Sequence, residues 1–198
     1  MAYIGKTPTA VPIGTNDLAD NIVTVSKLAS TLDLSSNTIT LPSGVGGKVL
    51  QVVSTTTTAV SSINSDSDSL TDIPNLNVSI TPSSTSSKIF LTGSVFYGID
   101  NNTYGSLGGI SFFRGTTQIG NGSDSIASGT VVGIGYTGTN NHVTVPIQFL
   151  DTPNSSSSLT YKIRCKNLIG GTVTFVVNGR RNGSQRGSST LTAFEIAG

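Results

Sequence analysis

From residue 48 to the end of the chain, short apolar clusters alternate with runs of Ser, Thr, Asn and Gly. Several clusters alternate apolar and polar residues strictly, as at Leu76, Val78 and Ile80, which turns one strand face to a core and the other to solvent. The pattern predicts strands at 48–54, 76–81, 88–97, 108–114, 116–120, 130–136, 143–150, 159–166, 172–178 and 189–196. No helical period interrupts them, which favours an all-β, antiparallel β-sandwich of the jelly-roll type.

One predicted strand, "KIFLTGSVFY", is apolar on both faces. Ile89, Leu91 and Val95 lie on one face, and Phe90 and Phe96 lie on the other. A strand of this kind needs a dry neighbour on each side. We expect the second neighbour to be another subunit, so an oligomer is favoured over a monomer.

The first 45 residues follow a different pattern. Residues 1–15 have no periodic face and contain Pro8 and Pro12, which predicts an extended arm. Residues 16–45 are expected to form a stalk, either a short amphipathic helix or an extended, irregular segment. The helical alternative depends on apolar residues spaced by 4, 3, 4 and 3 positions: Leu18, Ile22, Val25, Ala29 and Leu32. A strand-turn-strand and a glycine-rich linker close the stalk, so the head domain is expected to span 46–198.

The composition argues against nucleic acid and membranes as partners. Only 11% of the residues are charged and the net charge is +1, so the chain offers no strong field for nucleic acid. No apolar run reaches the roughly 18 residues of a membrane span, and the N-terminus does not resemble a secretory signal. We therefore expect neither nucleic-acid binding nor membrane insertion.

The chain has many serines but few partner residues that could activate a nucleophile. The single cysteine, Cys165, shares a strand face with Tyr161 and Ile163, which favours an inert core thiol over a nucleophile. The only histidine is His142, and no pair of carboxylates suggests a glycosidase cleft. We expect no enzymatic activity.

Two motifs that could bind a cofactor or metal are incomplete. "GIGYTG" at 133–138 matches a dinucleotide pattern but leads into a predicted strand, where that site requires a helix. Asp66, Asp68 and Asp72 lie close together but lack the glycine and glutamate of a calcium-binding loop. We expect no cofactor and no metal.

Basic residues gather in two places. Lys162, Arg164 and Lys166 share one face of a predicted strand, as a solvated surface or a subunit contact. The loop "NGRRNGSQRG" carries three arginines whose planar forks could bind sugars, carboxylates or phosphates: Arg180, Arg181 and Arg186. An ordinary surface hairpin is the alternative.

The chain resembles tail-fibre-like structural proteins of tailed bacteriophages, especially those of marine bacteria and cyanobacteria. The resemblance rests on "MAYIGKTP", "NDLADNIVTVSKLAS" and "LDLSSNTITLPSG", and on "IPNLNVSITPSSTSSKIFLTGSV", "ISFFRGTTQIG", "VPIQFLDTPNSSSSLTYKIRC" and "RGSSTLTAFEIAG". It implies a homotrimeric, non-enzymatic virion protein with an N-terminal attachment region and a jelly-roll head like that of TNF-like trimers. The chain lacks a long repetitive shaft, so a short fibre on the tail or capsid surface is expected.

The arm is expected to attach the fibre to another virion protein. The residues proposed for this contact are Tyr3, Ile4, Lys6, Pro8 and Pro12. A frayed terminus is the alternative.

Strict alternation of strand direction would sort the loops between two ends of the head. Loops near 57–74, 98–107, 121–129, 151–158 and 179–188 are then expected at the tip, and those near 82–87, 115, 137–141 and 167–171 at the base. The tip loops would contact host polysaccharide or lipopolysaccharide through Asp100, Asn101, Asn102, Tyr104, Asn154, Arg180, Arg181 and Arg186. A capsid or tail decoration protein without receptor binding is the alternative function.

Overall fold

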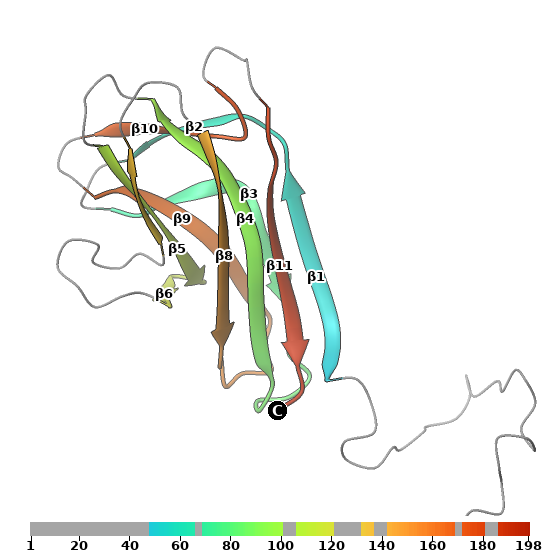
Figure 1. Ribbon diagram of the computed structural model, residues 1–198. Coiled ribbons are helices and arrows are strands. Elements are labelled where there is room, and N and C mark those ends of the chain that lie inside the picture. Colours follow the sequence, from blue (N-terminus) through green and yellow to red (C-terminus); the bar gives the residue numbers. More distant parts are fainter. Residues whose placement is uncertain are drawn as a thin grey trace, which may run out of the picture. The chain divides into compact units, whose positions relative to one another are not determined.

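The computed structural model describes residues 48–65, 69–100, 106–120, 132–136, 142–168, 172–180 and 186–198 (Figure 1). The strands within these ranges are β1 Val49–Thr57, β2 Ser61–Ser65, β3 Thr71–Ile80, β4 Lys88–Asp100, β5 Ser106–Arg114, β6 Thr117–Ile119, β7 Val132–Tyr136, β8 His142–Asp151, β9 Leu159–Asn167, β10 Val173–Val177 and β11 Ser189–Ile196. No helix in the described ranges is long and apolar enough to cross a membrane. The predicted arm and stalk, with Tyr3, Ile4, Lys6, Pro8 and Pro12, lie outside the described residues.

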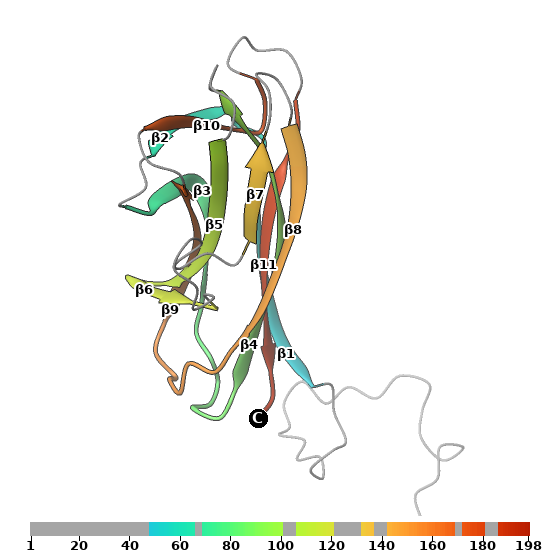
Figure 2. The same ribbon diagram turned by 60° about the vertical axis from the view of Figure 1, so that its left-hand side comes forward.

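The described strands form two antiparallel sheets that face each other (Figure 2). In sheet A the order is β1-β11-β4-β10-β2, and β8 pairs with the other edge of β4. In sheet B the order is β3-β9-β5-β6, and β7 also pairs with β5. The all-β antiparallel sandwich predicted from the alternation is confirmed, and it is consistent with the jelly-roll class.

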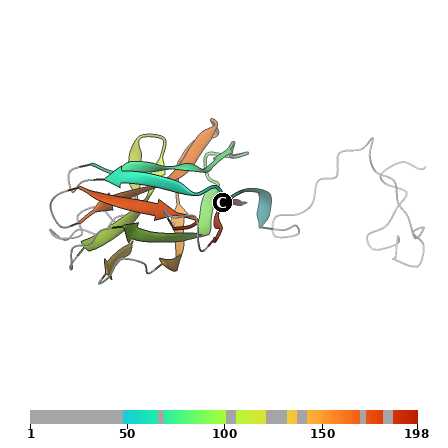
Figure 3. The same cartoon turned by 90° about the horizontal axis from the view of Figure 1, so that it is seen from above.

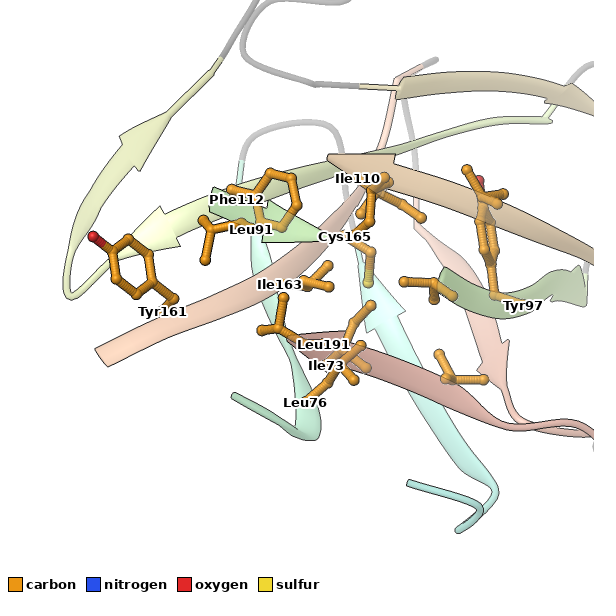
Figure 4. Close-up of a cluster of buried hydrophobic side chains, with 14 of the residues drawn as sticks. Ile73, Leu76, Leu91, Tyr97, Ile110, Phe112, Tyr161, Ile163, Cys165 and Leu191 are labelled. Atoms are coloured by element: carbon orange, nitrogen blue, oxygen red, sulfur yellow. The ribbon is translucent and has the colours of Figure 1, made fainter. Parts of the chain in front are cut away.

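Inward-facing side chains of both sheets form one core (Figure 4). The alternation seen in the sequence is obeyed: Tyr161, Ile163 and Cys165 of β9 point inward, as do Leu191 and Ala193 of β11. Burial raises the pKa of the Cys165 thiol to about 12, so this thiol stays protonated at neutral pH. The predicted core position of the cysteine is confirmed.

The sandwich has two distinct ends. At the Lys48 end, β1 and β4 begin, and β8 and β11 finish. The Ala197 backbone amide donates a hydrogen bond of 2.7 Å to the Lys48 carbonyl there. At the Asp100 end, β4 finishes opposite Thr174 of β10. Seen from above, β2 and β10 run side by side across this end (Figure 3).

The expected alternation of strand direction fails in the middle of the chain. β6 and β7 both pair antiparallel with β5 along one edge, so they run in the same direction. β10 and β11 likewise share one edge of β4. The strands β7, β8, β9 and β10 therefore run opposite to their predicted directions. The predicted strands that precede β7, and β11 after β10, run as predicted.

This inversion moves one described loop to the other end. The sequence predicts the loop near 151–158 at the tip, but β8 finishes with Asp151 opposite Ile89, so residues 152–158 follow at the Lys48 end. The strand ends that flank 137–141 and 167–171 lie toward the Asp100 end. The sequence predicts these two loops at the base, which is the Lys48 end. The loops that flank β4 and β11, including 82–87 and the strand ends beside 98–107 and 179–188, are placed as expected.

Strand β2 and the first half of β3 were not predicted. β2 has the sequence "SSINS", with Ile63 as its one apolar residue, so no alternation marks it. In β3, Pro74 and Asn75 interrupt the period, and Asn75 has a φ of 59° where the pairing with β9 shifts register. Both segments become strands because the neighbouring β10 and β9 supply hydrogen-bond partners.

A buried carboxylate holds the Lys48 end together. Glu195 of β11 accepts hydrogen bonds from the Ser83 amide (2.7 Å), the Ser83 hydroxyl (2.6 Å), the Ser87 hydroxyl (2.8 Å) and Gln51 Nε2 (2.7 Å). Burial alone would raise the pKa of Glu195, but these donors outweigh it and bring the pKa to about 2. The loop between β3 and β4 is thereby fixed to β11.

A second buried carboxylate joins the two sheets at the same end. Asp151 of β8 accepts 3.0 Å and 2.8 Å bonds from Arg114 Nη1 and a 2.6 Å bond from the Tyr161 hydroxyl. Arg114 belongs to β5 and Tyr161 to β9, so sheet B is tied to the last residue of β8. Burial and the bond to Asp151 raise the pKa of Tyr161, which keeps it a donor.

Replacement of Glu195 by Gln tests the first of these clusters. Because the folded-state pKa is lowered from 4.5 to about 2, the stabilisation is complete above pH 5 and disappears as the pH falls toward 2. We expect Glu195→Gln to lower the free energy of unfolding by roughly 2 kcal/mol at pH 7. Urea unfolding at pH 7, 4 and 2.5 should show the difference between wild type and variant shrinking with pH; a difference independent of pH would contradict the assignment.

Candidate functional site

The residues predicted to contact a receptor divide between the two ends. Asp100 closes β4. Arg186 pairs with Gly179 in an isolated bridge, and Arg180 follows Gly179, toward the Asp100 end. Asn154 lies in the 152–158 loop at the Lys48 end, so its predicted place beside the others is wrong. Asn101, Asn102, Tyr104 and Arg181 lie outside the described residues.

Asn178 holds the base of the segment that carries the arginines. Its φ of 62° is in the left-handed region, which asparagine tolerates better than most residues. The fully buried side-chain amide donates to the carbonyls of Thr57 (3.0 Å) and Ala59 (3.2 Å). It thereby links the residue after β10 to the end of β1.

The same asparagine is tied to the strands on its other side. The Ser189 hydroxyl donates to Asn178 Oδ1 at 2.6 Å and accepts from the Phe96 amide at 3.0 Å. The Asn178 amide donates to the Phe96 carbonyl at 2.9 Å, and the Gly187 amide donates to the Asn178 carbonyl at 3.2 Å. The chain on either side of 181–185 is therefore anchored to β4 and β11.

Aromatic packing completes this support. The Phe96 ring stacks on His142, with centroids 5.5 Å apart. Gly187 lies so close to Phe96 that a Cβ there would come within 2.3 Å of the ring, so only glycine fits. His142 thus packs against an aromatic ring on sheet A, whereas Cys165 is in the core on sheet B.

Two of the three predicted arginines are described at this end. Arg180 is half-buried and Arg186 is exposed, and neither forms an ion pair with a carboxylate in the described ranges. A guanidinium on a fixed backbone presents several planar N–H donors to sugar hydroxyls or anions. Ligand binding by Arg180 and Arg186 stays a prediction.

One carboxylate pairs with two residues of the basic face predicted on β9. Asp72 of β3 accepts a 2.8 Å bond from Lys162 Nζ and a hydrogen bond from Arg164 Nε, and Arg164 also covers the Phe113 ring at 4.2 Å. Burial would raise the pKa of Asp72, but the hydrogen bonds from Lys162 and Arg164 lower it overall. This partnership, across 90 residues of sequence, could not be predicted from the sequence.

Among the described residues, no group of three or more His, Cys, Asp or Glu side chains is placed to hold a metal ion. Asp72 of the proposed calcium segment is held by two basic side chains, and Asp66 and Asp68 are outside the described ranges.

Comparisons with known proteins find no related sequence and only distant structural alignments. No family model matches the sequence, and no curated protein matches it. Among solved structures, that of infectious bursal disease virus Gt strain aligns with a TM-score of 0.39 and 14% identity over 81% of this chain and 42% of that chain. The VP2 subviral particle of the same virus aligns with a TM-score of 0.33 and 15% identity over 87% and 46%. The chain spans less than half the length of these proteins, and a likeness at this level carries no functional information.

Replacement of Asn178 tests the support of the arginine segment. Asn178→Ala removes three side-chain hydrogen bonds. It also places alanine at a positive φ, which alanine tolerates less well than asparagine does. We therefore expect the free energy of unfolding to fall by about 3 kcal/mol. Asn154 also has a positive φ, 50°, but is exposed. Asn154→Ala should therefore cost under about 1 kcal/mol. Equal losses in urea unfolding would show that the buried hydrogen bonds contribute little.

Proposed function

We propose that this protein is a virion structural protein, a short trimeric tail fibre of a tailed bacteriophage. It is attached to the particle through its N-terminal residues and contacts the host cell surface at the Asp100 end. The proposal starts from the resemblance of the sequence to such fibres. The observation that supports it most is the separation of the two ends of the sandwich.

The Lys48 end is suited to the side of attachment. Residues 1–47 join the sandwich there, and this end is held by the buried carboxylates of Glu195 and Asp151. Arg180 and Arg186 lie toward the opposite end, near Asn178, which contacts Thr57 at the end of β1 and Ser189 at the start of β11. A fibre attached by its N-terminus would thus present Arg180 and Arg186 away from the particle.

The chemistry at the Asp100 end suits polysaccharide or lipopolysaccharide. Arginine forks donate to hydroxyls, carboxylates and phosphates, all of which occur on bacterial surface glycans. A single such site is weak, but three copies on one fibre would raise the overall avidity. Asn154, at the other end, takes no part in this contact.

An enzymatic role is not proposed. Each carboxyl group whose side chain is described already has structural partners: Asp72 with Lys162 and Arg164, Asp151 with Arg114 and Tyr161, and Glu195 with Gln51, Ser83 and Ser87. None is left to serve as general acid or nucleophile. A capsid or tail decoration protein without receptor binding remains the alternative, and it predicts that changes at the Asp100 end have no effect on adsorption.

Binding of the purified full-length protein to host cells tests the proposal. Arg180→Ala with Arg186→Ala removes two groups of donors, each worth about 1.5 kcal/mol, so we expect binding to fall by at least about tenfold. Asn154→Ala is the matched control at the opposite end and should bind as wild type does. Unchanged binding of the arginine variant, or loss in the Asn154 variant alone, would contradict the proposal. Release of soluble sugar from the cells would indicate an enzyme.

A further inference from the structure

An apolar row crosses the outer face of sheet A near the Lys48 end. Val52 of β1 is opposite Phe194 of β11, Phe194 is opposite Phe90 of β4, and Phe90 is opposite Leu150 of β8. The Phe90 and Phe194 rings contact each other with centroids 6.1 Å apart. We call these four residues the apolar row.

The ends of the row are open to solvent. Val52 is 52% exposed and Leu150 is 48% exposed. Next to Val52, at the start of β1, Val49 and Leu50 are 47% and 48% exposed. The large hydrophobic side chains that are exposed in the described ranges all belong to β1 and β8, the strands at the two ends of this row. Contiguous apolar surface of this kind marks a contact site.

The face around the row carries almost no charge. Toward the Asp100 end, the next outward positions are Ser54, Thr192, Thr92 and Gln148. Toward the Lys48 end they are Ile196 and the exposed Lys88. The outer face of sheet B differs, because Asp72, Lys162 and Arg164 form ion pairs there. A mainly apolar face, with Lys88 as the charged residue among these outward positions, fits a partner of the same apolar character.

We propose that the apolar row is the surface through which the sandwich packs against a second copy of this chain. This deepens the proposed function and rests on the oligomer that it assumes. The position of residues 1–47 in the sequence supports a second copy of this chain as the partner, because they join the sandwich at Lys48, directly before Val49. Association of the predicted stalks would bring the Lys48 ends of several copies together, and each Lys48 end carries an apolar row.

The proposal also explains the strand that is apolar on both faces. Ile89, Leu91 and Val95 of β4 fill the core of their own sandwich. Phe90, on the other face, is at the centre of the row, where the second copy would cover it.

Site-directed spin labelling of the full-length protein tests this contact. A label at Gln148→Cys lies on the outer face of sheet A, two residues from Leu150, and a label at Asn77→Cys lies on the outer face of sheet B as the matched control. Cys165 is buried and should stay unlabelled. We expect the label at 148 to be immobilised and the label at 77 to be mobile. Adding Val52→Lys and Leu150→Lys should make the label at 148 as mobile as the control.

The mass in solution separates this inference from the proposed function. If the label at 148 is mobile while light scattering gives a multiple of 20.3 kDa, the oligomer stands and the apolar row is not its contact. A monomer at all concentrations would overturn both. Immobilisation of the label only after another virion protein is added would assign the row to that protein and overturn the inference.

Discussion

The architecture depends on the hydrogen bonding of one long strand. β4 has thirteen residues, and Ile89 to Gly98 pair with β8 along one edge. The other edge is shared: β11 pairs with the half near Lys88, and β10 pairs with the half near Asp100. Every other strand of sheet A is therefore positioned by β4 directly or by a strand that pairs with it. Its inner face fills the core and its outer face carries Phe90.

The pairing of β4 also explains which parts of the fold could be predicted from the sequence. Alternation of apolar and polar residues depends only on burial, so it identified most strands and the sandwich class. Alternation does not say how many partners share an edge. Because β10 and β11 share β4, and β6 and β7 share β5, counting strands misplaced the 152–158 loop and Asn154. β2, with Ile63 as its one apolar residue, gave no signal.

The polar contacts were the least predictable part of the molecule. Glu195 meets Ser83 and Ser87 across more than 100 positions of sequence, and Asn178 meets Thr57 across 121. Each of these side chains looks unremarkable in its own segment. Together they give the sandwich a different character at each end, with buried carboxylates at the Lys48 end and a fixed base for the arginines toward the Asp100 end. The position of Asn154 was predicted incorrectly because it depended on topology, whereas the role of Arg180 and Arg186 stays a prediction.

The two ends and one face of the sandwich are proposed to make different contacts. A density map of the intact virion, at a resolution that places individual strands, tests this assignment most directly. The account predicts several copies that meet through the outer faces of sheet A, with Lys48 toward the particle and Arg180 and Arg186 toward solvent. A map in which the Asp100 end is buried against another virion protein, or in which the chain is absent from the particle, would contradict it.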